Sequence, residues 1–536
     1  MSSDLIATSE PPTDSPRPGE GAGAKIEGAA EFYFREHNVL ADVGRLALRG
    51  GTISVVSGYG NAAVQIIAAV VLARLLTPGD FGLVAIITTL TSFAPFLIDF
   101  GMADAIIQRN KITPGQVSSL FWMSFGIGLA IAAILAGGST LIASTYHEPR
   151  LQSVALCSAL TFALSGMSGQ HLSLLRRALQ FTSIAKIQFG GVLASVVIAV
   201  LLGFAGAGYW ALVIRPIANA AFVTVGAWLA CPWRPGRPIV DREVKSMVGF
   251  GLHVVGFSVA YSFSRAVDRI GLGLFYSARD LGYYQNAVTL YDSSIYSVFP
   301  LIHNVGSAAL SKLQSNYAAL SEKYETALSV VAFFIMPTAA IMSVTAQDLT
   351  VILLGEKWRP AGALLAILAL RGIFQPIEMS QGWLHLSLGR ADRWKNWGLI
   401  SAVVQVVAVA CGLPFGMNGV AIAIVVASAL IAFPSASYAG RPAGIGTRLV
   451  VRAVGRQLLG AVICVVAGWL FEQAALQQVS SIPRILILGC FSGAIYLLIV
   501  LGLFRLTSPL EIVGRFIYRQ LPSRAATWIS SRFPGG

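Results

Sequence analysis

The chain has 536 residues, of which 55% are hydrophobic and only 12% are charged, and its mean hydropathy is +0.70. This balance excludes a water-soluble globular protein, because such a chain needs far more charged surface. The formal net charge of +13 does not require a nucleic-acid partner, since basic residues of membrane proteins gather on the cytoplasmic side and attract anionic lipid headgroups.

The first part of the chain predicts a cytoplasmic tail followed by a bundle of six membrane-spanning helices. Residues 1–49 are expected to form a disordered and interfacial tail, because the first 28 are rich in Pro, Gly, Ser and Glu. A helix of roughly 20 apolar residues crosses the hydrocarbon core of a bilayer. Six such segments make up an N-terminal bundle over 50–230, and they are 50–73, 80–100, 117–146, 151–173, 184–205 and 207–230.

A cytoplasmic linker over 231–246, rich in Pro and basic residues, is expected to separate this bundle from a second one over 247–440. The second bundle contains 247–275, 286–310, 326–346, 361–388, 396–413 and 417–438. Two further helices, 456–476 and 484–506, are expected within 441–507. Residues 508–536 then alternate apolar and basic positions, which is typical of an amphipathic cytoplasmic tail on the inner leaflet. The predicted fold is an all-α polytopic membrane protein with about 14 transmembrane helices.

A short pattern occurs twice in the chain, 200 residues apart, each time between two long apolar stretches. Each copy has a hydroxyl residue, an Asp and a Gly at the same spacing, and the matching pairs are Thr77 with Ser277, Asp80 with Asp280 and Gly82 with Gly282. Further matches follow downstream, namely Pro95 with Pro300, Asp99 with Asn304, Gly101 with Gly306 and Ala103 with Ala308. A parallel internal repeat of this kind predicts two similar halves with a transport pathway between them.

The distribution of Lys and Arg predicts the orientation of the chain. With the N-terminus inside, most of the 38 basic residues fall in cytoplasmic segments. Six lie in extracytoplasmic segments, and they are Arg74, Arg150, Arg279, Lys357, Arg359 and Arg484. Both termini of this multi-pass membrane protein are therefore expected in the cytoplasm.

The pattern around the first repeat resembles a known family. Leu72–Gly82, Asp99–Gly101, Asp268–Gly271 and Asp280–Tyr284 are similar to the polysaccharide-transporter branch of the multidrug/oligosaccharidyl-lipid/polysaccharide flippase superfamily. The resemblance implies two six-helix bundles around a central cavity that opens alternately to the two sides. It further implies export of an undecaprenyl-diphosphate-linked oligosaccharide, the repeat unit of an exopolysaccharide or lipopolysaccharide O-antigen, to the periplasmic leaflet.

Charged residues within the predicted spans are candidate site residues, because a charge at this depth is costly and faces a cavity or a partner. Arg265 and Arg269 share one helix face, with Asp268 between them, and the triplet keeps one positive charge. An anionic diphosphate would suit such a face, since the guanidinium group can donate two hydrogen bonds to phosphate oxygens. The alternative is a structural ion pair, and the sequence leaves both open.

Four more residues complete the candidate site. Arg371 precedes Glu378 by two helical turns on the tenth predicted span, so the two can share a polar face. Arg371 is expected opposite Arg265 and Arg269 across the cavity. Arg215, in the sixth span, is a further candidate cation. Asp292, with Asp268 and Glu378, is a candidate for coupling transport to an ion or for charge pairing.

The expected partners are the lipid-linked oligosaccharide, membrane lipids and a polysaccharide polymerase or chain-length regulator. No catalytic residue, metal site or cofactor is predicted, because the predicted outside loops are short and the five cysteines are scattered. An ATP-driven pump is disfavoured, since the sequence has no phosphate-binding loop motif. A drug/cation antiporter of the same fold is the alternative function, and it would require carboxylates in its cavity.

Overall fold

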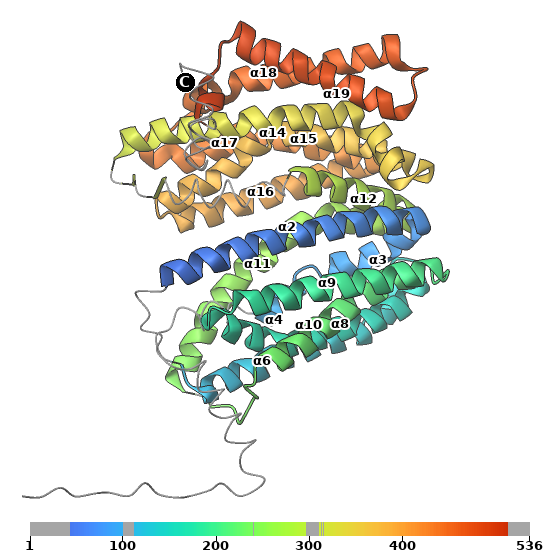
Figure 1. Ribbon diagram of the computed structural model, residues 1–536, viewed down its shortest axis with the longest axis vertical. Helices are drawn as coiled ribbons and strands as arrows, with labels where there is room; N and C mark the ends of the chain where they lie inside the picture. The colour runs from blue at the N-terminus through green and yellow to red at the C-terminus, as the bar shows by residue number, and fades with distance from the viewer. Residues whose placement is uncertain are drawn as a thin grey trace, which may run out of the picture.

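The computed structural model describes residues 43–99, 112–239, 241–295, 310–311, 313–314 and 316–512. Within these ranges the regular structure is helical, and the helices run side by side in one elongated stack (Figure 1). Each of the 14 apolar segments expected from the sequence overlaps at least one of these helices. The tails predicted over 1–49 and 508–536 lie mostly outside the described residues.

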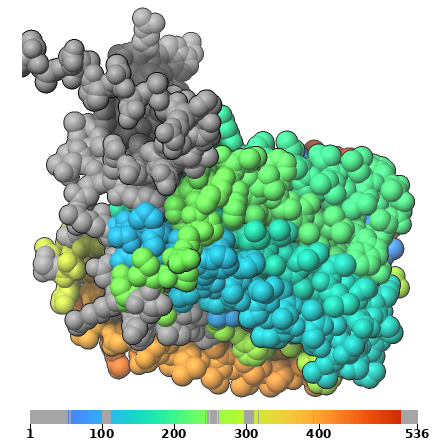
Figure 2. All heavy atoms as spheres, turned by 90° about the horizontal axis from the view of Figure 1, so that it is seen from below, coloured from blue at the N-terminus to red at the C-terminus, as the bar shows by residue number. Residues whose placement is uncertain are grey.

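The N-terminal helices form one end of the stack. They are α2 (Val43–Leu75), α3 (Pro78–Leu90), α4 (Ala94–Asp99), α6 (Pro114–Gly137), α7 (Ser139–Thr145), α8 (Arg150–Arg177), α9 (Phe181–Phe204) and α10 (Trp210–Ala230). Helix α9 packs between α2 and α10, and α8 packs against both α6 and α10. The face seen in Figure 2 belongs mainly to these helices. Exposed apolar side chains on α6 and α8, among them Leu129, Ile134, Leu156 and Leu160, suit contact with lipid chains.

The C-terminal helices form the other end of the stack, and α2 of the N-terminal set lies across the middle, where α11 and α12 are also seen (Figure 1). They are α11 (Arg242–Phe275), α12 (Ala278–Ile295), α14 (Tyr317–Leu354), α15 (Arg359–Ser387), α16 (Ala391–Gly412) and α17 (Gly416–Gly440). The last two, α18 (Thr447–Phe471) and α19 (Ser481–Leu497), pack against each other and against α14. The two sets of helices meet chiefly where α12 lies against α3.

Several helix boundaries have a clear local cause. At the start of α3, Thr77 and Asp80 form a capping box, and Pro78 occupies the first turn, where its missing N–H is not needed. Helix α11 begins at Arg242 because the Asp241 carboxylate accepts a hydrogen bond from the backbone N–H of Val244. The segment expected as a linker over 231–246 is therefore non-helical only in its first part, and its last residues belong to α11.

The described helices are long and apolar enough for a multi-pass membrane protein. Eleven candidate membrane-spanning segments satisfy length and hydropathy requirements among the described residues. One of them, Asp392–Ala443, covers α17 and all of α16 except its first residue. Helices α11 and α12 are not among the eleven. Both carry charged residues near the middle of the molecule, and the exact count of 14 spans stays a prediction.

Candidate functional site

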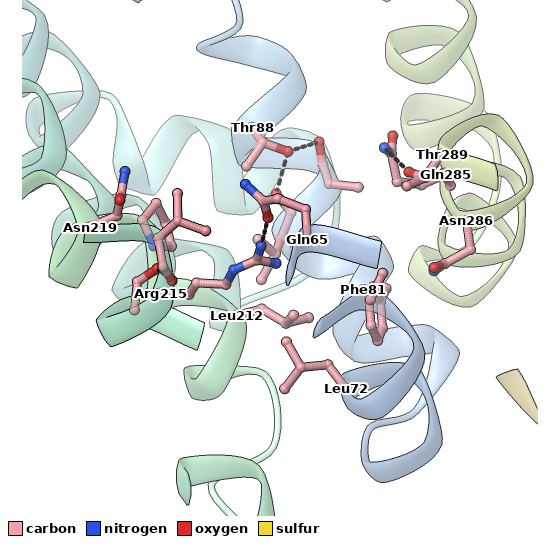
Figure 3. A pocket seen from close by; sticks show the side chains of 16 residues that line it. Gln65, Leu72, Phe81, Thr88, Leu212, Arg215, Asn219, Gln285, Asn286 and Thr289 are labelled. Atoms are coloured by element: carbon pink, nitrogen blue, oxygen red, sulfur yellow. Dashed lines mark hydrogen bonds between the residues drawn. The ribbon is translucent and has the colours of Figure 1, made fainter. Parts of the chain in front are cut away.

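A cavity of about 370 Å³ lies between the N-terminal helices and α12 (Figure 3). Helices α2, α3, α9 and α10 form one side of it, and α12 forms the other. Its polar lining consists mainly of amides and hydroxyls, contributed by Gln65, Thr88, Ser195, Asn219, Gln285, Asn286 and Thr289. Among the described lining residues, Arg215 is the one ionisable side chain.

Arg215 lies on α10 and is partly buried in the cavity wall. Its guanidinium group donates a hydrogen bond to the Oε1 atom of Gln65 on α2 (Figure 3). No carboxylate of the described residues forms an ion pair with Arg215, so its charge is held by a neutral amide. A membrane-level cation without a counter-ion is costly unless it faces water or an anion, and the cavity supplies that space.

The amide groups around Arg215 have unused hydrogen-bonding capacity. Asn219 lies one helical turn beyond Arg215 on α10, and its Oδ1 atom is buried without a hydrogen-bond donor in the described structure. On the facing wall, Gln285 donates to Thr289 at 3.3 Å, and Asn286 donates to the carbonyl of Gly282 at 3.2 Å. These groups can still donate and accept further bonds, as recognition of a polyhydroxylated ligand requires.

A second group of candidate residues lies wholly within the C-terminal helices, on α11, α12 and α15. In this charge cluster, each arginine has an acidic neighbour. Arg265 lies 3.7 Å from Asp292 and Arg269 lies 3.5 Å from Asp268. The third pair, which connects two turns of α15, is Arg371 with Glu378 at 3.8 Å.

Asp268 is the most heavily bonded carboxylate of the charge cluster. It accepts hydrogen bonds from the Tyr284 hydroxyl at 2.8 Å and from the backbone N–H of Arg269 at 2.8 Å. Its side chain is only 12% exposed, and Tyr284 is fully buried. Because Tyr284 belongs to α12, its bond to Asp268 fastens α11 to α12.

The three pairs form one electrostatic unit. Asp292 is within interaction range of all three arginines, and Glu378 of Arg371 and Arg265. Three guanidinium groups and three carboxylates therefore give the charge cluster no formal net charge. The positive charge that the sequence assigns to the triplet on α11 is balanced by Asp292 of α12, a contact between helices that spacing within α11 could not predict.

The Arg265–Asp292 pair lies on a continuation of the cavity wall. Asp292 follows Gln285 and Thr289 at helical spacings of seven and three, so the three share one face of α12. The side chains of Arg265 and Asp292 are 35% and 36% exposed, which leaves both accessible to a polar ligand.

The structure thus separates the predicted site residues into two groups. Arg265, Asp268, Arg269, Asp292, Arg371 and Glu378 come together in the charge cluster, whereas Arg215 lines the cavity. Arg371 does not lie opposite Arg265 and Arg269 as expected; it lies beside them, and the residue on the opposite wall is Arg215. Sequence reasoning missed the polar lining, for which Gln65 and Asn219, polar positions within otherwise apolar helices, were the available signal.

Comparison with known proteins relates this architecture to polysaccharide assembly. A family model described as "Polysaccharide biosynthesis protein" matches residues 71–363. The teichuronic acid biosynthesis protein TuaB of Bacillus subtilis is 27% identical over 338 residues, which cover 62% of this chain and 70% of the relative. The lipopolysaccharide biosynthesis protein WzxC of Escherichia coli is 26% identical over 358 residues, covering 65% and 72%.

Two solved structures share the fold. The lipid II flippase MurJ in an inward closed conformation superposes with a TM-score of 0.66 and 13% identity, covering 84% of this chain and 98% of that one. An inward-facing multidrug resistance MATE family transporter of the MOP superfamily gives a TM-score of 0.53 with 12% identity, covering 72% and 94%. These likenesses show that the chain shares its all-helical fold with the two transporters.

Proposed function

The chain belongs to the family of polysaccharide biosynthesis proteins, and on that premise we propose that it is a flippase for a lipid-linked oligosaccharide. Its cargo is an undecaprenyl-diphosphate-linked repeat unit of an exopolysaccharide or lipopolysaccharide O-antigen. The protein moves the headgroup from the cytoplasmic to the periplasmic leaflet of the bacterial inner membrane and is a transporter, not an enzyme.

The observation that carries this proposal is the charge of the cavity lining. Arg215 is its one ionisable residue among the described positions, and no described carboxylate lines it. A diphosphate is an anion whose paired oxygens match the donors of a guanidinium group. In the structure, the guanidinium group of Arg215 donates a hydrogen bond to the neutral amide of Gln65 on α2. A diphosphate that binds Arg215 therefore replaces a neutral partner and does not have to break an ion pair.

The rest of the lining suits the sugar part of such a cargo. Asn219 and Ser195 lie on the Arg215 side, and Gln285, Asn286 and Thr289 lie across from them. Amides and hydroxyls exchange hydrogen bonds with sugar hydroxyls without selecting for charge. The lipid tail stays in the bilayer, because burying it in a polar cavity would forfeit its favourable contact with lipid.

We assign the charge cluster a role in the conformational cycle. Asp268, Asp292 and Glu378 each have an arginine neighbour in this state. The side chains of Arg265 and Asp292 are partly exposed, on the continuation of the cavity wall along α12. Exchange of partners among Arg265, Arg269 and Arg371 would let the headgroup pass along α12 with little loss of electrostatic stabilisation. Coupling of this exchange to an ion gradient belongs to the same proposal.

In the proposed orientation, the end of the molecule where α3 and α15 begin faces the periplasm. Arg74, Lys357 and Arg359, expected outside, lie together at the end of the molecule where α3 and α15 begin, and Arg150 is within interaction range of Asp80 there. With this end outward, both termini lie in the cytoplasm. A polysaccharide polymerase or chain-length regulator would receive the cargo at the outer face.

A drug/cation antiporter is the second candidate, because the fold is shared with a multidrug transporter. An organic cation would need a carboxylate in the cavity, and the charge cluster offers Asp292 and Glu378 beyond it. Their arginine neighbours weaken this alternative.

Purified protein in proteoliposomes tests the proposal. A fluorescently labelled undecaprenyl-diphosphate oligosaccharide is incorporated in both leaflets, and a membrane-impermeant quencher reports the headgroups that become accessible with time. We expect the wild type to expose the inner-leaflet pool far faster than protein-free liposomes do. A wild type that leaves the lipid in place but exports an organic cation under a proton or sodium gradient would establish the antiporter instead.

A further inference from the structure

The two copies of the repeated sequence pattern meet at the end of the molecule where α3 and α12 begin. The hydroxyl of Thr77 and the carboxylate of Asp80 cap α3, and Ser277 and Asp280 make the equivalent contact at α12, with the two side chains 2.7 Å apart in each case. Helices α3 and α12 then lie against each other over much of their length. The repeat therefore places two equivalent helix starts in direct contact.

The contact is made by backbone at two reciprocal glycines. A β-carbon at Gly82 would overlap the carbonyl oxygen of Ala278 and lie 2.9 Å from the backbone nitrogen of Gly282. A β-carbon at Gly282 would overlap the carbonyl oxygen of Pro78 and lie 3.1 Å from the nitrogen of Gly82. Neither position admits another residue while the helices stay this close.

A second set of bonds ties α2 to α14 and its following turn beside the glycines. The ammonium group of Lys357 donates to the carbonyls of Arg74 at 2.9 Å and Leu76 at 2.6 Å. The indole N–H of Trp358 donates to the carbonyl of Ala73 at 2.8 Å. In return, Arg74 donates to the carbonyl of Leu353 at 3.0 Å and to that of Ile352. Both helix ends thereby satisfy terminal carbonyls that have no partner within their own helices.

These contacts also border the cavity at this end. Leu72 and Phe81 line the cavity, and the Phe81 ring packs edge-on against Trp358 with ring centres 5.2 Å apart. Trp358 is fully buried and also packs against Tyr283. Trp358 therefore contacts Phe81 of the cavity lining and also bonds to Ala73 of α2, so the cavity lining is connected to the bonds between the two sets of helices.

We propose that Gly82, Gly282, Arg74, Lys357 and Trp358 form a latch that holds the extracytoplasmic end of the cavity shut. This inference rests on the proposed alternating-access function and specifies how one of its two states is held. The glycines permit backbone contact, and the donors of Arg74, Lys357 and Trp358 close the remaining gap. Opening outward separates α3 from α12 and breaks all these contacts together, so the latch behaves as an all-or-none switch.

A single methyl group tests the latch. Gly82→Ala prevents the close approach, whereas Gly79→Ala in the same helix is the matched control, because its nearest neighbour would be Thr77 Oγ1 at 3.8 Å. The reporter is a single cysteine, Thr289→Cys, in the cavity of a full-length chain whose five native cysteines are replaced. Its reaction rate with an impermeant thiol reagent is measured from each side, in spheroplasts and in inverted vesicles.

We expect Gly82→Ala to raise the labelling rate from outside about tenfold relative to Gly79→Ala, because the closed state is lost. Equal outside rates for the two variants would overturn the latch, and an increase confined to inverted vesicles would overturn its assignment to the extracytoplasmic end.

Lys357→Met keeps the proposal testable even if Gly82→Ala fails to fold. It removes the two hydrogen bonds to the carbonyls of Arg74 and Leu76 but keeps a side chain of similar length, so a smaller increase in outside labelling is expected. An unchanged rate would overturn the role of Lys357 in the latch. The assay needs no substrate. Altered labelling in a protein that moves no lipid-linked oligosaccharide would refute the proposed cargo and leave the latch standing, whereas transport with unchanged labelling would do the reverse.

Discussion

The N-terminal and C-terminal helices share a repeated sequence pattern but hold their membrane-level charges in opposite ways. Arg215 of α10 has a neutral amide, Gln65, as its partner. On the C-terminal side, three arginines and three carboxylates neighbour one another across α11, α12 and α15. The comparison indicates a division of labour, with an anion-binding wall on one side and a balanced, rearrangeable charge cluster on the other.

Removing the charge of Arg215 is expected to have the largest effect. Arg215→Gln should slow headgroup translocation about 100-fold, because a charge-assisted contact to the diphosphate in a poorly solvated cavity is lost. The initial rate in proteoliposomes measures this. Arg452→Gln is the control, since it changes an exposed arginine that pairs with Glu325 away from the cavity. If Arg215→Gln moved the headgroup at a rate within about twofold of the control, Arg215 would not be part of an anion-binding wall, and the proposed difference between the N-terminal and C-terminal helices would be wrong.

Asp268 provides the next test, of stability. Asp268→Ala should lower the free energy of unfolding by about 3 kcal/mol, because it strands Arg269 and the buried Tyr284 hydroxyl. The side chain of Asp292 is 36% exposed, so the matched variant Asp292→Ala should lower the free energy of unfolding by less than about 1 kcal/mol. Denaturant titration in mixed micelles measures both, and similar losses would show that the charge cluster has no structural centre at Asp268.

A charge exchange sharpens the contrast further. Arg265→Asp alone places a second carboxylate beside that of Asp292, and the repulsion between the two like charges should reduce the translocation rate about tenfold. The double variant Arg265→Asp with Asp292→Arg should recover most of that rate, because the pair is restored in reverse. Failure of the double variant to recover would mean that Arg265 contacts the cargo itself, and the charge cluster would join the binding wall.

The smallest effect is expected at the exposed pair of Arg452 and Glu325. The two side chains are 67% and 27% exposed, so Glu325→Gln should change the free energy of unfolding by less than about 0.5 kcal/mol. The same denaturant titration measures it. A larger loss would show that surface pairs in this chain contribute as much as the charge cluster.

The sequence predicts the helices and the candidate charges better than it predicts their partners. Apolar segments locate every α-helix from α2 to α19 in the described ranges, whereas the capping box of Thr77 and Asp80 is seen only in the structure. Arg371 and Glu378 lie within one helix, so their spacing alone brings them together. Arg265 and Asp292 belong to different helices, and their pairing depends on how α11 crosses α12, which no local pattern encodes.

Two further features show the same limit. Lys357 indicates topology in the sequence, and its bonds to α2 appear only when two distant helix ends are brought together. The repeat identifies Gly82 and Gly282 as equivalent positions but not as each other's neighbours. In both cases the missing information is the packing between the two sets of helices.

Binding of a soluble cargo analogue distinguishes Arg215 from the charge cluster as the site of the diphosphate. A short-chain prenyl-diphosphate oligosaccharide is titrated by calorimetry against wild type, Arg215→Gln and the double variant Arg265→Gln with Asp292→Asn, which preserves the net charge of the charge cluster. We expect Arg215→Gln to weaken binding at least about tenfold and the double variant to bind within about twofold of wild type. Strong loss in the double variant with normal binding by Arg215→Gln would contradict this expectation and place the diphosphate on the C-terminal helices.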